Sequence, residues 1–81
     1  MELKDTIEMM QSEDYKERFK AEYHQVRIRR EKLITILDKW NRGCLGFEPK
    51  CSFEMLCIQR DTMQAYLSVL RERAHIEGIQ L

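Results

Sequence analysis

The fold is decided by residues 19–40, which read FKAEYHQVRIRREKLITILDKW. Within this stretch, the large apolar side chains recur in steps of four, three, seven, four and three residues. They are Phe19, Tyr23, Val26, Leu33, Leu37 and Trp40. These steps place all of them on one face of an α-helix. The stretch therefore predicts a long helix that buries a single apolar stripe.

Both ends of this helix are marked in the sequence. Ser12 precedes two acidic residues, which is the pattern of a helix N-cap followed by a first turn that favours negative charge. Gly43 opens a region with a second glycine and the single proline, and a glycine readily adopts the left-handed conformation that ends a helix. We therefore expect a helix over residues 13–42 and a loop over residues 43–52.

A second helical pattern follows the loop. Ser52 is its expected N-cap, Glu54 lies in its first turn, and Gly78 marks its end. Its apolar stripe comprises Leu56, Met63, Leu67, Leu70 and Ala74. We expect this helix over residues 53–76, and the short loop forces it to fold back along the first helix.

The expected fold is an all-α antiparallel two-helix hairpin in a single domain over residues 1–81. The chain has 81 residues, of which 43% are hydrophobic and 35% charged, with 3 glycines and 1 proline. This composition argues against disorder and against a turn-rich β fold. Leu3, Ile7 and Met10 predict a short N-terminal helix within residues 1–11.

A hairpin alone leaves one apolar surface unexplained. A second stripe on the second helix lies roughly opposite the first. It comprises Ile58, Ala65, Val69 and Ile76. Because two helices make a thin core, we expect this stripe to be buried against another copy, so that the hairpins assemble into a homo-oligomeric helical bundle. The alternative is that the N-terminal segment covers the stripe within one chain.

Several classes of function are disfavoured by the sequence. Lys plus Arg and Asp plus Glu each total 14, so the net charge is zero, and we expect no binding to duplex nucleic acid. No apolar run is long enough to span a membrane. The spacing of Cys44, Cys51 and Cys57 does not suit zinc, and we expect no metal and no cofactor. No nucleophile lies near an evident base, so we expect a protein that is not an enzyme.

Polar side chains also occur where the helical pattern expects apolar ones. Arg30 falls within the stripe of the first helix, and Gln59, Thr62 and Arg73 align with Tyr66 between the two stripes of the second. Burying a lone guanidinium costs several kcal/mol unless it finds an anionic partner. One interpretation is structural, with Arg30 and Arg73 paired to Glu22, Glu77 or a neighbouring chain. The other is a site for a phosphate or carboxylate ligand.

The basic cluster at residues 27–32 bears on the same choice. Arg27 and Arg30 are three residues apart and share a face, whereas Arg29 is expected to face elsewhere. As a solvated helix face the cluster needs no ligand, but a compact phosphate suits it better than a duplex.

The second helix also carries a recognisable motif. From Gln59 to Arg73 it follows the pattern Q-x-x-x-M-x-x-Y-x-x-x-L-x-x-R. Further matching positions are Asp14, Tyr15, Lys16, Leu33, Leu37, Cys51, Met55 and Leu56. In these residues, over about residues 13–78, the chain resembles a family of small phage proteins named after crAss-like phages. The resemblance implies a phage-encoded, hairpin-shaped protein in the cytoplasm of an infected bacterium.

The chain is also similar in size and architecture to the phage sponge proteins that sequester cyclic oligonucleotide signals of bacterial immunity. The similarity implies a helical homo-oligomer that binds its ligand between protomers without acting on it chemically. The candidate ligand-binding residues are Tyr23, Arg27, Arg30, Gln59, Thr62, Tyr66 and Arg73. Arginines would neutralise phosphates, a tyrosine would stack on a base, and Gln59 and Thr62 would contact polar edges.

Three hypotheses therefore remain open from the sequence. The first is a phage counter-defence protein that sequesters a small cyclic nucleotide. The second is an inhibitor that docks a helical face on a host defence protein, as anti-restriction or anti-CRISPR factors do. The third is a structural dimerisation module without a ligand.

Overall fold

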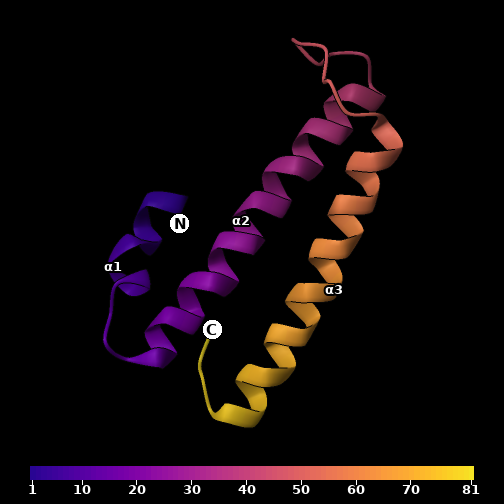
Figure 1. Ribbon diagram of the computed structural model, residues 1–81. Helices are drawn as coiled ribbons and strands as arrows, with labels where there is room; N and C mark the ends of the chain where they lie inside the picture. The colour runs from indigo at the N-terminus through magenta and orange to yellow at the C-terminus, as the bar shows by residue number, and fades with distance from the viewer.

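Two long antiparallel helices, α2 (Tyr15–Asn41) and α3 (Phe53–Glu77), form the hairpin that the sequence predicts (Figure 1). The computed structural model describes residues 1–81. A 3-10 helix, η1 (Leu3–Thr6), and one turn of α-helix, α1 (Ile7–Met10), precede the hairpin, and the chain contains no strand. The all-α fold class is confirmed. No helix combines the length and the apolar character needed to cross a lipid bilayer.

The long helices start at caps of the expected type, but one cap lies at a different residue. Asp14, not Ser12, is the N-cap of α2, and its Oδ1 accepts a hydrogen bond from the backbone N–H of Lys16 at 2.9 Å. The Ser12 hydroxyl is used in the preceding turn, where it accepts from the Asp14 N–H at 3.1 Å. Ser52 caps α3 as predicted, accepting from the N–H of Met55 at 3.1 Å.

Glycines end both long helices. Gly43 follows α2 with φ of 73°, and Gly78 follows α3 with φ of 70°. In this left-handed conformation the chain reverses, and the N–H of the next residue reaches back to a carbonyl of the last turn. The bonds run from Cys44 to Lys39 at 3.0 Å and from Ile79 to Ala74 at 2.8 Å. The second reversal folds Ile79 into the core, which the sequence pattern did not predict.

One seam between α2 and α3 forms the core. Its six clustered residues are Phe19, Tyr23, Leu67, Leu70, Ala74 and Ile79, with Val26 packed alongside. Leu33 and Leu37 are buried closer to the loop. Only 11 of the 81 residues are buried, so the hairpin has a narrow core. A core of this size leaves the isolated chain marginally stable.

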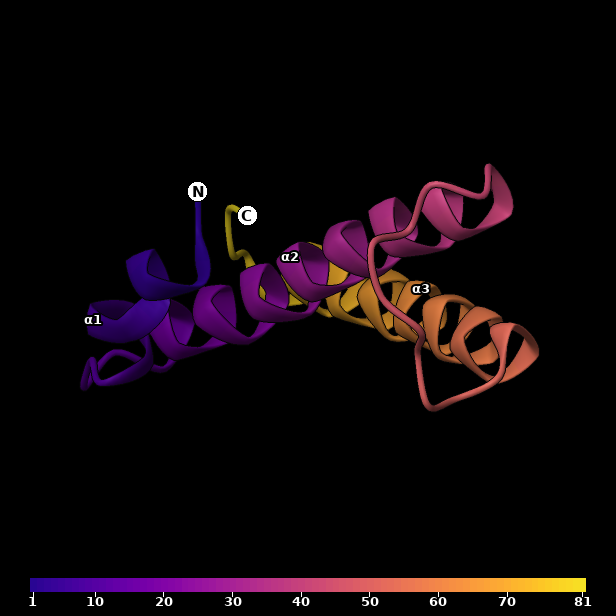
Figure 2. The same cartoon turned by 90° about the horizontal axis from the view of Figure 1, so that it is seen from above.

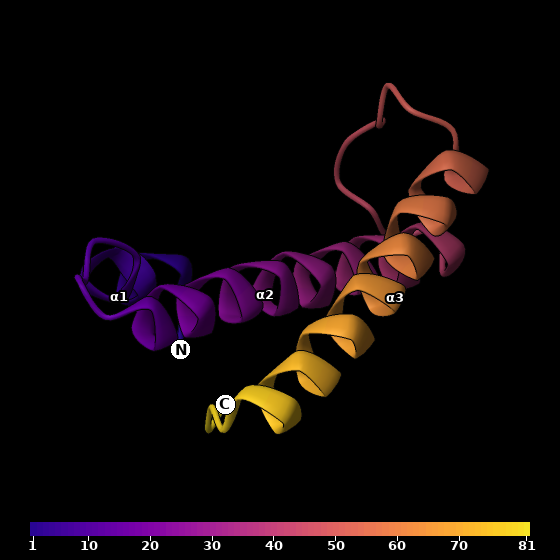
Figure 3. The same cartoon turned by 60° about the horizontal axis from the view of Figure 1, so that its bottom comes forward.

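The two helices cross at an angle and do not lie parallel, as the views in Figures 2 and 3 show. At the loop end, the rings of Trp40 and Phe53 meet edge to face with centroids 5.4 Å apart. The molecule measures 43 × 24 × 17 Å along its principal axes. Because the helices cross, their side chains interlock in some regions and leave hollows in others.

The N-terminal segment packs on the opposite side of α2 from α3 (Figure 1). Its anchor is Thr6, which is 1% exposed and whose hydroxyl donates to the Leu3 carbonyl and accepts from Gln25 Nε2 at 3.0 Å. Ala21 and Ile28, which share a helix face with Gln25, are both buried. This polar and apolar contact holds the segment against α2.

The second apolar stripe of α3 is therefore uncovered. The N-terminal helices contact α2 and not α3, so the alternative in which they cover this stripe is wrong. The structural reason is that they dock on the far side of α2. Ile58, Val69 and Ile76 are 58%, 54% and 73% exposed.

Leu70 is 1% exposed in the core seam, so shortening its side chain should strongly lower the stability of the fold. We expect Leu70→Ala to lower the free energy of unfolding by about 2–5 kcal/mol, because it removes buried methyl groups and leaves a cavity. The matched control is Leu81→Ala, since Leu81 is 43% exposed and should change stability by less than about 0.5 kcal/mol. Urea denaturation followed by circular dichroism measures both, and equal effects would contradict a core placed at this seam.

Candidate ligand-binding groove

A groove of about 420 Å³ opens at the surface between α2 and α3. Its walls come from both helices. The lining residues are Val26 and Arg29 from α2, and Met55, Ile58, Gln59, Thr62, Met63 and Tyr66 from α3. Most of this lining is apolar, with a few polar groups and one charge. This combination is typical of small-molecule sites, in which apolar walls exclude water and sparse polar groups orient the ligand.

Three of the predicted ligand-binding residues meet in this groove: Gln59, Thr62 and Tyr66. The Thr62 hydroxyl donates to the Ile58 carbonyl at 2.8 Å, and its oxygen can still accept a hydrogen bond. Neither the Gln59 amide nor the Tyr66 hydroxyl bonds to another part of the chain. Tyr66 is 41% exposed and lies along the apolar wall. The groove therefore offers an aromatic face together with unused donors and acceptors.

Arg29 supplies the only charge in the groove, although we expected it on another face of the helix. It is also the one arginine without a hydrogen bond or ion pair inside the chain. The partners of the others are Ser12 for Arg18, Glu31 for Arg27, the Arg60 carbonyl for Arg30, Asp38 for Arg42, Asp61 for Arg60, Tyr23 for Arg71 and Glu77 for Arg73. Arg29 therefore remains available to an external anion.

Arg30 and Arg73 are engaged elsewhere. Arg30 is half-buried on the core side of α2, and its Nε donates to the backbone carbonyl of Arg60 at 3.3 Å. Arg73 pairs with Glu77 at 2.9 Å, and its guanidinium lies 4.9 Å from the centre of the Phe19 ring. Glu77 is one of the partners that the structural interpretation named for Arg73, although the Arg73 side chain is 51% exposed and not buried. Neither residue lines the groove.

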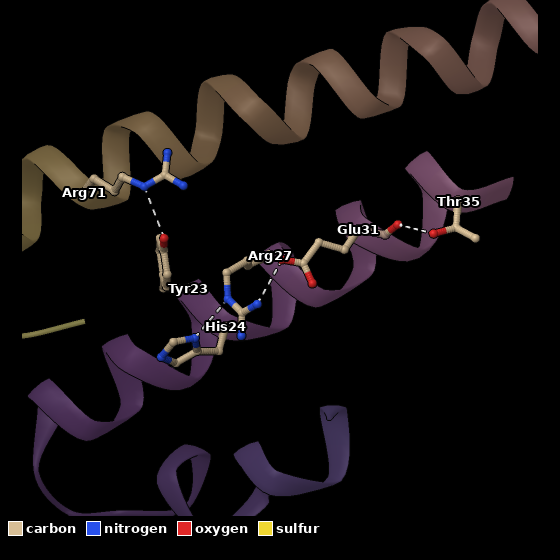
Figure 4. A network of polar contacts seen from close by, with 6 residues as sticks. All are labelled: Tyr23, His24, Arg27, Glu31, Thr35 and Arg71. Atoms are coloured by element: carbon tan, nitrogen blue, oxygen red, sulfur yellow. Dashed lines mark hydrogen bonds and ion pairs between the residues drawn. The ribbon is translucent and has the colours of Figure 1, made fainter. Parts of the chain in front are cut away.

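Tyr23 and Arg27 belong to a polar network that stabilises the hairpin (Figure 4). The buried Tyr23 hydroxyl accepts a hydrogen bond from Arg71 Nε at 3.1 Å, which links α2 to α3. On α2, Arg27 donates to His24 Nδ1 at 3.3 Å and to Glu31 Oε1 at 3.0 Å. The structure thus separates four of the seven predicted residues from the groove, and a ligand role for those four stays a prediction.

Arg29 was missed because a helical wheel does not show how two helices rotate against each other. Arg29 follows Val26 by three residues, so it lies at the edge of the apolar stripe of α2. The row formed by Gln59, Thr62 and Tyr66 lies at the matching edge of α3. The sequence does place Arg29 and the polar row at the edges of their stripes. Only the packed hairpin shows that these two edges lie on the same side of the molecule.

The other hollows lack these features. A hollow of about 290 Å³ near the loop contains Arg60, which is paired with Asp61 at 2.9 Å. A third, of about 250 Å³, lies within the loop region around Trp40 and Pro49. The three cysteines are free thiols. No cluster of three histidine, cysteine, aspartate or glutamate side chains is arranged to hold a metal ion.

The hydrogen bond between Arg71 and Tyr23 predicts that removing the Tyr23 hydroxyl destabilises the chain more than removing the Tyr66 hydroxyl does. Tyr23→Phe removes the hydroxyl that accepts from Arg71 and should lower the free energy of unfolding by about 0.5–1.5 kcal/mol. Tyr66→Phe is the matched control, because the Tyr66 hydroxyl has no partner in the chain, and should leave stability within about 0.5 kcal/mol. Thermal and urea unfolding measure both variants. A loss confined to Tyr66→Phe would contradict these placements.

His24 predicts a pH dependence of stability. Partial burial, followed by the positive charges of Arg27, the N-terminus and Lys20, lowers the pKa of His24 below its ordinary value of 6.5. As the pH falls, His24 therefore gains a proton in the unfolded chain before it does so in the folded chain. The contribution of neutral His24 to the free energy of unfolding is fully present above pH 6.5 and is lost as the pH falls below that value. We expect His24→Gln to reduce the decline in unfolding free energy between about pH 7.5 and about pH 5.5. His75→Gln, at an exposed position of α3, should retain the decline seen in the unmodified chain.

A comparison with known protein families places the hairpin in a named group. The model of the Sequestin family matches residues 13–76, which include α2, the loop and nearly all of α3. The matched region contains every residue that lines the groove. No curated protein and no solved structure matches the chain. The match covers well over half of the sequence, and the chain belongs to the Sequestin family.

Proposed function

We propose that this protein binds and sequesters a small phosphorylated signal, a cyclic oligonucleotide, in the groove between α2 and α3. Sequestration is also what the family name Sequestin suggests. In this proposal it is a phage counter-defence protein that acts in the cytoplasm of the infected bacterium. The observation that carries the proposal is the unpaired Arg29 in an apolar groove beside Tyr66.

The chemistry of the groove suits the parts of a nucleotide. A guanidinium is a planar fork that forms charge-assisted hydrogen bonds with phosphate oxygens, and apolar walls shield such bonds from water. The Tyr66 ring provides a surface on which a base can stack. Gln59 and the Thr62 oxygen can bond to the polar edge of a base or sugar. The volume of about 420 Å³ lies within the usual range for small-molecule sites.

The protein acts in this proposal by binding alone. The lining residues include no carboxylate, histidine or cysteine, so the groove offers neither a general base nor an activated nucleophile. Capture lowers the free concentration of a signal and requires no turnover. Affinity and the amount of protein then determine the effect.

The uncovered stripe of α3 supports self-association. An exposed apolar stripe of this kind is typical of an interface, and two copies of a neutral chain do not repel each other through net charge. Because Ile58 and Tyr66 belong both to the exposed surface and to the groove, a second copy on this stripe would also border the site. We therefore place the ligand at an interface between protomers of a homo-oligomer.

A second candidate function uses the same stripe differently. Ile58, Val69 and Ile76 could dock on a host defence protein, which the exposed fractions of all three favour as much as they favour a second copy. In that case the protein would be an inhibitor that acts through its helical face, and Arg29 would have no ligand to bind.

The decisive test compares two arginine variants in ligand binding. The unmodified chain is screened against cyclic di- and trinucleotides by thermal shift and calorimetry, and we expect at least one to raise the melting temperature. Arg29→Gln should weaken the binding of that ligand by about 1.5–3 kcal/mol, which is about tenfold or more. Arg42→Gln is the matched control, because Arg42 is exposed, pairs with Asp38 and does not line the groove.

Either of two results would contradict the proposal. An unchanged melting temperature across the panel at saturating concentration would argue against a cyclic oligonucleotide. Equal losses of affinity in Arg29→Gln and Arg42→Gln would show that binding depends on general charge and not on the groove.

A further inference from the structure

The polar network drawn in Figure 4 contains hydrogen-bond donors that its internal bonds do not use. The Tyr23 hydroxyl accepts a hydrogen bond from Arg71 Nε at 3.1 Å, and its own hydrogen has no acceptor in the chain. The two terminal nitrogens of Arg71 also lack a partner. The contact between α2 and α3 at Tyr23 therefore presents free donors from both helices.

Neighbouring residues of α2 add further donors. Arg27 Nε donates to His24 Nδ1 at 3.3 Å, so neutral His24 carries its proton on Nε2, which has no partner in the chain. Arg27 bonds to Glu31 through one terminal nitrogen and keeps the other free. The rings of Tyr23 and His24 meet edge to face with centroids 5.2 Å apart. We call Tyr23, His24, Arg27 and Arg71 the donor cluster.

Arg71 brings to the donor cluster a charge that no carboxylate neutralises. It forms no ion pair within the chain. The side chains one and two turns away on the same face of α3 include no acidic residue. They are Gln64, Ser68 and His75. The exposed guanidinium of Arg71 is therefore available to an anion from solution.

The charges on α2 also favour an anion at this place. Lys20 pairs with Glu17 at 3.1 Å, and Arg27 pairs with Glu31 at 3.0 Å. After burial, the positive charges of Arg27, the N-terminus and Lys20 are the causes that lower the pKa of His24. The surroundings of His24 are therefore positive even though both side-chain cations have a carboxylate partner.

The donor cluster is separate from the groove. Arg27 and Arg29 are two residues apart, which turns their side chains about 200° from each other around α2. Neither the groove nor the other two hollows are lined by any residue of the cluster. The Tyr23 ring is 7% exposed, and the Arg71 guanidinium lies 5.6 Å from its centre. The cluster thus offers donors and positive charge, but no cavity and no open aromatic face.

We propose that the donor cluster is a second anion site, complete within one chain, for a compact tetrahedral oxyanion such as inorganic phosphate. Its free groups are donors, and a phosphate has several acceptor oxygens that can bond to a guanidinium, a hydroxyl and an imidazole N–H together. A nucleoside does not fit, because the cluster has no surface on which a base can stack. The site depends neither on the groove nor on a second copy, so it stands apart from the proposed function.

An anion in this position joins the two long helices. It bonds to Arg71 on α3 and to His24 and Tyr23 on α2, so it adds a bridge beside the single hydrogen bond that links these residues now. A ligand that binds only the folded chain raises its stability. Phosphate should therefore stabilise the hairpin more than chloride does at equal ionic strength.

Titration with inorganic phosphate, followed by nuclear magnetic resonance, tests the site. The titration is run at about pH 7.5, where His24 is neutral, with sodium chloride holding the ionic strength constant. We expect saturating shifts at Tyr23, His24 and Arg71, together with a higher melting temperature. Shifts that do not saturate, or shifts centred on Arg29 and Tyr66, would overturn the proposal.

Variants of the cluster separate binding from structure. Arg71→Gln should weaken phosphate binding at least tenfold, because glutamine can still donate to the Tyr23 hydroxyl but carries no charge. Tyr23→Phe keeps that charge, removes one donor and should weaken binding about two- to tenfold. Arg42→Gln, at an exposed arginine outside the cluster, is the matched control and should bind phosphate as the unmodified chain does. Equal binding by all four proteins would overturn the site, and its loss in Arg42→Gln would show an effect of general charge.

Discussion

The packing of α2 against α3 along one seam is the constraint on which the rest of this structure depends. A pair of helices can bury only the faces that they turn toward each other, and here that seam centres on Tyr23, Leu67 and Leu70. Every other apolar side chain must be covered by another element or stay exposed. The N-terminal segment covers one face of α2, and the outward face of α3 stays exposed.

The groove is a consequence of the same packing. The helices cross, as Figure 2 shows. The groove is lined by residues from both of them. Edge positions of an amphipathic helix often carry amphipathic residues such as tyrosine and arginine, whose apolar parts pack while their polar ends reach solvent. Tyr66 and Arg29 occupy these edges. The site therefore arises from the border between core and surface and needs no separate domain.

The arginines show why the number of charges in a sequence is a poor guide to a binding site. Most of them are satisfied within the chain by carboxylates, backbone carbonyls or the Tyr23 hydroxyl. Such contacts between exposed groups each contribute little to stability, but they occupy the guanidinium. Arg29 has the same chemistry and differs only in its surroundings, which contain apolar groups and no carboxylate. Its availability follows from the helix pairing.

The sequence by itself determined the helices, their approximate ends and their antiparallel order, because apolar periodicity and glycine caps act within a few residues of chain. It also identified Gln59, Thr62 and Tyr66 as a polar row on α3, since a helical wheel needs only spacing. Only the tertiary structure decided that the N-terminal segment docks on α2 and not on α3, and that Arg29 joins the polar row. These outcomes depend on the rotation and crossing of whole helices, which many weak contacts set together and which no local pattern encodes.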